Sequence, residues 1–253
     1  MARWTREELL LALGLYFETP FGKQHKGYKK IIELAGLFGR TPSAVAMKLC
    51  NFTSLDPLEA ERGISGLSGA SNLDRQIWSE FENNKELLVE EIEQLREKVV
   101  LVVNNGNVID DSPTAPVGPT SRYGQTTQRR HQNFFRRVVL GSYGNRCCIT
   151  GLPIPELLRA SHIVPWSDSE EQRLNPCNGL CLSATFDAAF DRGLISFDSA
   201  NRLMLSQYFL ENSGNKEVVN SFLSREGMPM TLPEKNLPDP ILIQWHVENI
   251  FIG

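Results

Sequence analysis

The sequence contains no apolar run that approaches the roughly 20 residues needed to cross a bilayer as a helix. Its opening, MARWTREELL, has the amphipathic pattern of a helix rather than the pattern of a signal peptide. Five cysteines in 253 residues, two of them adjacent at 147 and 148, do not form a paired disulfide framework. We therefore expect no membrane partner, a cytoplasmic location and reduced thiols.

Acidic residues are absent from residues 112–155, which carry six arginines, although the net charge of the whole chain is −4. The preceding segment, 61–111, has the opposite balance, with eleven acidic residues against five basic ones. One interpretation of the basic segment is a solvated helix face. The other is a surface that binds a phosphate backbone, because arginine forks match phosphate oxygens and neutralised phosphates release counterions. In that case the contacts come from Arg129, Arg130, Arg136 and Arg137.

The N-terminal region has the start and stop signals of three helices. Thr5 and Glu8 have the spacing of a capping box, which predicts a first helix over 6–17. Apolar residues at helical spacing predict a second helix that ends at Gly39. A threonine cap followed by proline predicts a third helix over 42–51.

The short turn between the second and third helices resembles a helix-turn-helix. On that interpretation the third helix enters a DNA groove, and Arg40 and Lys48 face phosphates. The alternative is an ordinary three-helix bundle, in which Ala44, Val45 and Leu49 belong to the core.

The chain as a whole predicts an α+β protein, with an all-helical domain followed by a mixed domain. We expect a helical domain over 1–103, a linker rich in Asn and Pro over 104–121, and a second domain over 122–253. Within these domains we expect an ordered loop at 54–73, helices at 74–103 and 125–140, a strand or short helix at 203–209, and a final strand at 241–247.

The residues that suggest chemistry lie between positions 146 and 198. Histidine 162 stands in a short alternating segment that ends in proline, which predicts a strand next to a loop. Asp187 and Asp191 are four residues apart and share one face of a predicted helix. A histidine that titrates near neutrality is suited to activate water, and carboxylates are suited to bind Mg²⁺. Each residue alone also has an ordinary structural explanation.

Taken in order, ASHIVPW, NGLCL and an aspartate nine residues after Asn178 resemble the ββα-metal finger of HNH endonucleases. The resemblance covers roughly residues 130–210, from a Cys-Ile-Thr-Gly turn to FDRGLISFD. It implies that His162 is the general base, that Asn178 positions the histidine, and that Asp187 holds a metal ion, with Asp191 as a second candidate ligand. The third family position holds Asp rather than His, and Ser161 replaces a charged ligand, so the implied ligand set is sparse.

The resemblance implies a metal-dependent endonuclease acting on double-stranded DNA with Mg²⁺, Mn²⁺ or another divalent cation. The N-terminal run WTREELLLALGLYFETPFGK, with GRTPSAVAMKLCNF, resembles a domain fused to such modules in bacterial proteins, which suggests a restriction or defence role. We expect a homodimer, because two sites cut two strands most easily. Structural zinc is not expected, because the cysteine spacing is poor for it. The alternative is a non-catalytic DNA-binding regulator with a degenerate HNH module.

Overall fold

The computed structural model of the protein describes residues 3–103, 122–212 and 216–253. The fold is α+β, as predicted: helices fill the N-terminal part, and two small hairpins with further helices follow. By its internal contacts the chain divides into two compact units, Met1–Arg137 and Val138–Gly253. The linker expected at 104–121 lies outside the described residues. None of the described helices combines the length and apolar character needed to cross a membrane.

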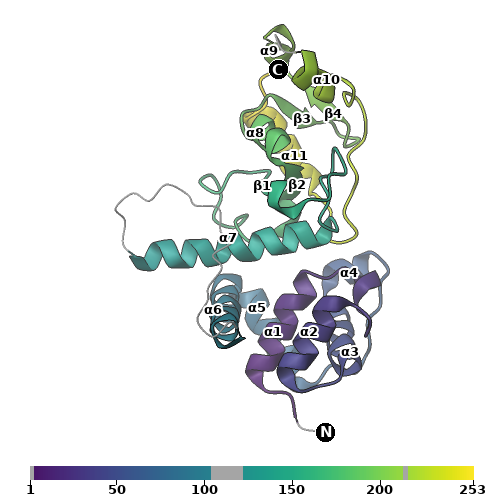
Figure 1. Ribbon diagram of the computed structural model, residues 1–253, viewed down its shortest axis with the longest axis vertical. Helices are drawn as coiled ribbons and strands as arrows, with labels where there is room; N and C mark the ends of the chain where they lie inside the picture. The colour runs from purple at the N-terminus through teal and green to yellow at the C-terminus, as the bar shows by residue number, and fades with distance from the viewer. Residues whose placement is uncertain (1–2, 104–121, 213–215) are drawn as a thin grey trace. The chain divides into compact units, whose positions relative to one another are not determined.

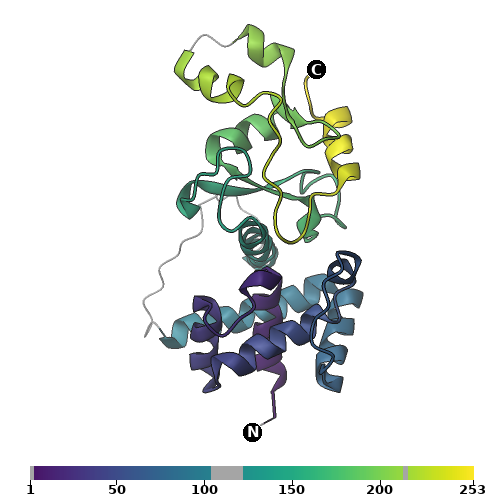
Figure 2. The same ribbon diagram turned by 90° about the vertical axis from the view of Figure 1, so that its right-hand side faces the viewer.

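The first unit is a helical bundle built around α1. Its elements are α1 (Arg6–Phe17), the 3₁₀ turn η1 (Phe21–Lys23), α2 (Lys29–Phe38), α3 (Pro42–Thr53), α4 (Pro57–Glu61), α5 (Asn72–Asn83), α6 (Lys85–Val103) and most of α7 (Arg122–Ser142). Helix α1 contacts α2, α3, α5 and α6, and every residue from Leu9 to Phe17 is buried. Figures 1 and 2 show α1 to α6, in purple to blue, packed beside one another.

The predicted helix caps are present in this unit. Thr5 and Glu8 exchange side-chain and backbone hydrogen bonds, and α1 has the bounds expected from the sequence. Gly39 adopts the left-handed conformation (φ 61°) that ends α2. Thr41 caps α3, which continues to Thr53, two residues beyond the predicted end.

Two predictions in the first unit are wrong in detail. The helix expected over 74–103 is broken, because Asn84 leaves helical geometry (φ −152°) and its side chain accepts a hydrogen bond from Leu87 N–H that begins α6. The expected loop at 54–73 contains α4, which starts where Asp56 caps the helix and Pro57 takes its first position.

The second unit contains the two hairpins. Its elements are the end of α7, η2 (Pro155–Leu157), β1 (Leu158–His162), η3 (Pro176–Asn178), β2 (Gly179–Ser183), α8 (Ala184–Asp191), β3 (Ile195–Phe197), β4 (Leu203–Leu205), α9 (Gln207–Glu211), α10 (Lys216–Leu223) and α11 (Pro240–Asn249). Strand β1 pairs antiparallel with β2, so that His162 lies opposite Gly179. Helix α8 packs on both strands (Figure 1), and α11 packs on β3.

The C-terminal region departs from the sequence prediction. The strand expected at 241–247 is the helix α11, because Asp239 accepts a hydrogen bond from Ile241 N–H and Pro240 takes the first helical position. The segment expected to form a strand or a short helix forms both, as β4 and α9.

Candidate active site

A cavity of about 360 Å³ in the second unit collects most of the residues predicted to carry chemistry. Strand β1 contributes Arg159, Ser161 and His162, and α8 contributes Asp187 and Asp191. The loop after β1 and helix α11 complete the wall. Residues that the sequence grouped by a motif are therefore grouped in space as well.

His162 is held by the backbone of the loop between the two strands. Its Nε2 lies 3.1 Å from the carbonyl oxygen of Arg173. A carbonyl can only accept, so Nε2 carries the proton in this hydrogen bond and the neutral ring has its lone pair on Nδ1. Burial lowers the pKa of His162, while the bond to Arg173 acts in the opposite direction. The neutral form, which can accept a proton, is therefore favoured near pH 7.

No described hydrogen bond joins Asn178 to the imidazole of His162. Asn178 instead fixes the loop that contains Arg173. Its Oδ1 accepts from Val164 N–H (2.8 Å), and its Nδ2 donates to the carbonyls of Val164 (3.0 Å) and Gln172 (3.2 Å). The side chain is fully buried. Because Gln172 precedes Arg173, Asn178 positions the carbonyl that orients His162.

Asp187 and Asp191 present two carboxylates to the cavity from one face of α8. Ser161 Oγ donates a hydrogen bond to Asp191 Oδ1 at 3.4 Å. Burial of the Asp191 carboxyl and then the nearby charge of Asp187 raise the pKa of Asp191 to about 6, although the residue as a whole is exposed. In the described part of the chain no three His, Cys, Asp or Glu side chains are grouped to hold a metal ion.

A second histidine, His246 of α11, also lines the cavity and was not predicted. Its Nε2 donates to the carbonyl of Phe190 (3.1 Å), so its Nδ1 accepts from the Ser196 hydroxyl (3.0 Å). The ring stacks on Phe190 with centroids 3.8 Å apart. With both nitrogens occupied inside the core, His246 supports the wall of the site and is not placed to take a proton.

The basic residues predicted to face DNA from the N-terminal helices form ion pairs within the first unit. Lys48 is buried and its ammonium lies 2.8 Å from Asp74. Arg40 binds Glu8 at 2.7 Å and lies over the ring of Trp4. These contacts tie α3 to α5 and α1 to the turn before α3.

The arginines of α7 divide into two groups. Arg130 pairs with Glu90 (3.3 Å) and Glu97 (2.9 Å) of α6. Arg137 binds Glu93 and lies 2.9 Å from Glu18. The acidic segment of the sequence thus supplies partners for its basic segment. Of the other two predicted contacts, Arg129 is exposed and Arg136 is half-buried.

All five cysteines are free thiols. Cys147, Cys148 and Cys181 are buried, and burial raises the pKa of Cys148 well above its usual value. They form part of the core behind the hairpin, where Cys148 N–H donates to the carbonyl of Cys181.

Residues 147–198 match the family model of the HNH endonucleases. The matched segment contains β1, β2 and α8, and with them His162, Asn178, Asp187 and Asp191. No curated protein matches the chain. Residues 147–198 of the second unit are therefore similar to the HNH endonucleases.

Proposed function

We propose that the protein is an endonuclease that hydrolyses phosphodiester bonds of double-stranded DNA with the help of a divalent cation. The observation that carries the proposal is the hydrogen bond from His162 Nε2 to the Arg173 carbonyl. It leaves the lone pair of the neutral imidazole on Nδ1, in a residue that lines the same cavity as two carboxylates. A base beside a cluster of hard oxygen ligands is the arrangement that phosphodiester hydrolysis requires.

In the proposed reaction His162 takes a proton from a water molecule as the water oxygen attacks phosphorus. The new phosphorus–oxygen bond forms as the bond to the leaving sugar oxygen breaks, and the leaving oxygen gains a proton from solvent. Asn178 keeps the Arg173 carbonyl in place, so the imidazole stays in the tautomer that can accept the proton.

The donor set fits Mg²⁺ or Mn²⁺. Asp187 and Asp191 offer carboxylate oxygens from one face of α8, and Mg²⁺ needs only one or two protein carboxylates when waters and phosphate oxygens complete its shell. A bound cation stabilises negative charge on the phosphate and on the leaving oxygen.

For the DNA backbone we propose Arg129 as the first contact among the predicted cations, because its side chain is exposed, whereas Arg40, Lys48, Arg130 and Arg137 are held in ion pairs. A restriction or defence role agrees with such an activity. A homodimer would place one cavity at each strand of the DNA. Sedimentation of the free and of the DNA-bound protein measures this oligomeric state.

Nicking of supercoiled plasmid tests the proposal. We expect cleavage with Mg²⁺ or Mn²⁺ and none in EDTA. Asp187→Asn should lower the rate about 100-fold, because the proposed ligand loses its charge, while Asp168→Asn, an exposed aspartate outside the cavity wall, should cleave normally. Salt-sensitive DNA binding without cleavage under any divalent cation would instead indicate a non-catalytic DNA-binding protein.

A further inference from the structure

Arg159 stands in the wall of the cavity, three residues before His162 on β1. It is half-buried and shares the cavity with Asp187 and Asp191. Among the described residues that line this cavity, it is the only lysine or arginine. The sequence pattern did not single it out.

The hydrogen bonds of Arg159 leave one edge of its guanidinium available. Nη1 donates to the backbone carbonyls of Leu158 (3.0 Å) and Glu156 (3.4 Å). Within the described residues no carboxylate lies within ion-pair distance of Arg159, and its Nε and Nη2 have no hydrogen-bond partner there. Arg130 and Arg137 differ, because carboxylates occupy their guanidinium groups.

The positive charge of Arg159 offsets the repulsion between a phosphate and the carboxylates of the cavity. Before a divalent cation binds, a phosphate that enters the cavity meets the carboxylates of Asp187 and Asp191, and like charges in a partly dry site repel strongly. A guanidinium fork binds two oxygens of a phosphate at once and keeps its charge at every working pH. The carbonyl bonds to Nη1 hold the group before the substrate arrives, which lowers the entropic cost of binding.

We propose that Arg159, through Nε and Nη2, binds the non-bridging oxygens of the phosphate that is cleaved. This inference rests on the proposed nuclease function. It makes Arg159 a catalytic residue that contacts the reacting group. A purely structural role, in which Nη1 only secures the turn before β1, predicts an effect on folding but none on DNA.

Binding without divalent cations isolates the contact from cleavage. The full chain is titrated into a fluorescent 30-base-pair duplex in EDTA at several salt concentrations. Arg159→Gln should reduce the slope of log affinity against log salt by about 1, the loss of one phosphate contact. Arg159→Lys should keep the slope. Arg225→Gln is the matched control, because Arg225 also donates from Nη1 to a backbone carbonyl but lies outside the cavity wall.

Single-turnover cleavage with Mg²⁺ then places the contact at the reacting phosphate. Arg159→Gln should cleave about 100-fold more slowly, and Arg159→Lys should fall between that variant and the wild type, because lysine keeps the charge but lacks the fork. Thermal unfolding shows whether each variant is folded. If Arg159→Gln does not fold, the rate defect of a folded Arg159→Lys decides.

An unchanged salt slope in folded Arg159→Gln would overturn the inference. A reduced slope with a wild-type cleavage rate would also overturn it, because the contact would then lie away from the cleaved bond. Failure of the wild type to cleave under any divalent cation would reject the proposed function instead, and the slope in EDTA would still report whether Arg159 touches a phosphate.

Discussion

Two histidines of the same cavity wall, His162 and His246, differ in role although their side chains are chemically identical. Both His162 and His246 direct Nε2 to a backbone carbonyl, which fixes the neutral tautomer. In His246 the remaining nitrogen is bound to Ser196 inside the core, and the ring is stacked on Phe190. His162 stands half-buried at the cavity. Burial in the core and the bond to Ser196 make His246 a structural histidine, whereas the place of His162 in the cavity makes it a candidate base.

His246 gives a pH dependence of stability. Burial, only partly offset by the bond to the Phe190 carbonyl, lowers its pKa to about 4, against 6.5 for the free residue. The unfolded chain therefore binds this proton first as pH falls. The contribution of neutral His246 to the free energy of unfolding is therefore complete above pH 6.5 and is lost as the pH falls toward 4. We expect about 2 kcal/mol less stability at pH 5 than at pH 7.5 from this group.

Urea unfolding of the wild type and of His246→Gln at both pH values measures this contribution. The wild type should lose more stability on acidification than the variant, because glutamine does not titrate. Equal losses in the two proteins would show that His246 does not carry the effect.

Asn178→Ala tests a second buried polar residue of this unit. The change removes three hydrogen bonds and leaves backbone groups of Val164 and Gln172 without that partner. We expect a loss on the order of 3 kcal/mol in the free energy of unfolding, measured in urea. Asn249→Ala, which removes one exposed side-chain bond to the Trp245 carbonyl, should lose less than about 1 kcal/mol. Similar losses in both variants would contradict this account of Asn178.

The candidate site could be predicted from the sequence where its residues are close together along the chain. His162, Asn178 and Asp187 lie within one hairpin and the helix after it, so the resemblance of this short segment to a family motif was enough to propose them together. The Arg173 carbonyl and His246 could not be found this way. A backbone carbonyl has no signature in the sequence, and His246 reaches the cavity only because α11 packs on β3.

At the scale of elements, the bounds of a helix could be predicted best where a local cap sets them. They could be predicted least well where packing against distant elements sets them. The bounds of α1 follow from Thr5 and Glu8, which act within one turn. The apolar run at 241–247 suits either a strand or a helix, and the Asp239 cap with Pro240 decides for a helix. The break at Asn84 was missed because apolar spacing continues across it.

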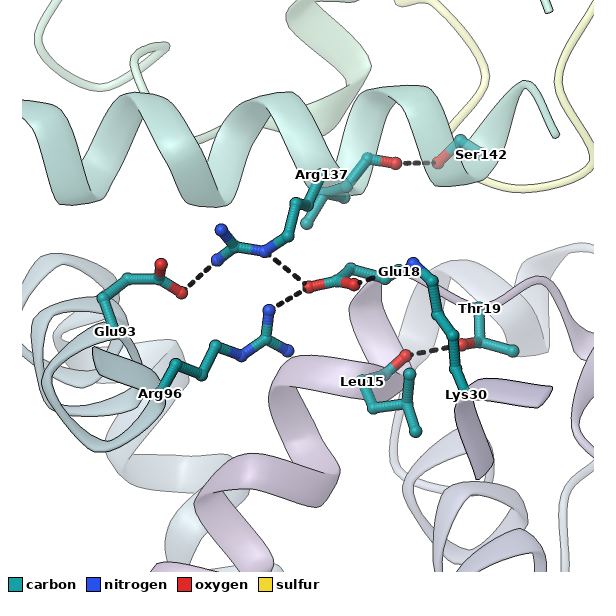
Figure 3. Close-up of polar contacts among 9 residues, drawn as sticks. Leu15, Glu18, Thr19, Lys30, Glu93, Arg96, Arg137 and Ser142 are labelled. Carbon is teal, nitrogen blue, oxygen red and sulfur yellow. Dashed lines mark hydrogen bonds and ion pairs between the residues drawn. The ribbon is translucent and has the colours of Figure 1, made fainter. Parts of the chain in front are cut away.

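Helix packing in the first unit depends on a buried ion network at the end of α1 (Figure 3). Glu18 accepts from Arg96 of α6 (2.5 Å) and Arg137 of α7 (2.9 Å), and lies 3.2 Å from Lys30 of α2. Burial alone would raise the pKa of Glu18, but these three positive charges outweigh it and lower the pKa to about 2. One carboxylate thus joins four helices.

Glu18→Gln should destabilise the protein by about 3 kcal/mol, because three cations lose the buried anion that they share. Glu33→Gln is the control. It removes an exposed pair with Lys29 at 3.8 Å and should change stability by less than about 0.5 kcal/mol. Chemical denaturation measures both, and a Glu18 variant as stable as the Glu33 variant would contradict a stabilising network.

For the whole molecule, the distribution of charge along the sequence does not by itself predict which charged side chains are paired in the structure. The sequence places an acidic segment, 61–111, directly before a basic segment, 112–155. In the structure Glu90, Glu93 and Glu97 neutralise Arg130 and Arg137. Residue counts contain no information on which charges form pairs. Only the three-dimensional structure therefore identifies Arg159 as a cation in the wall of the candidate site.

The most direct test of the central claim is the single-turnover rate of DNA cleavage by the wild type, by His162→Ala, and by His162→Ala with added imidazole, all in Mg²⁺. We predict a loss of about 100-fold to 10,000-fold in His162→Ala, because the general base is removed, and partial recovery with imidazole. A folded His162→Ala that cleaves at the wild-type rate would contradict the account.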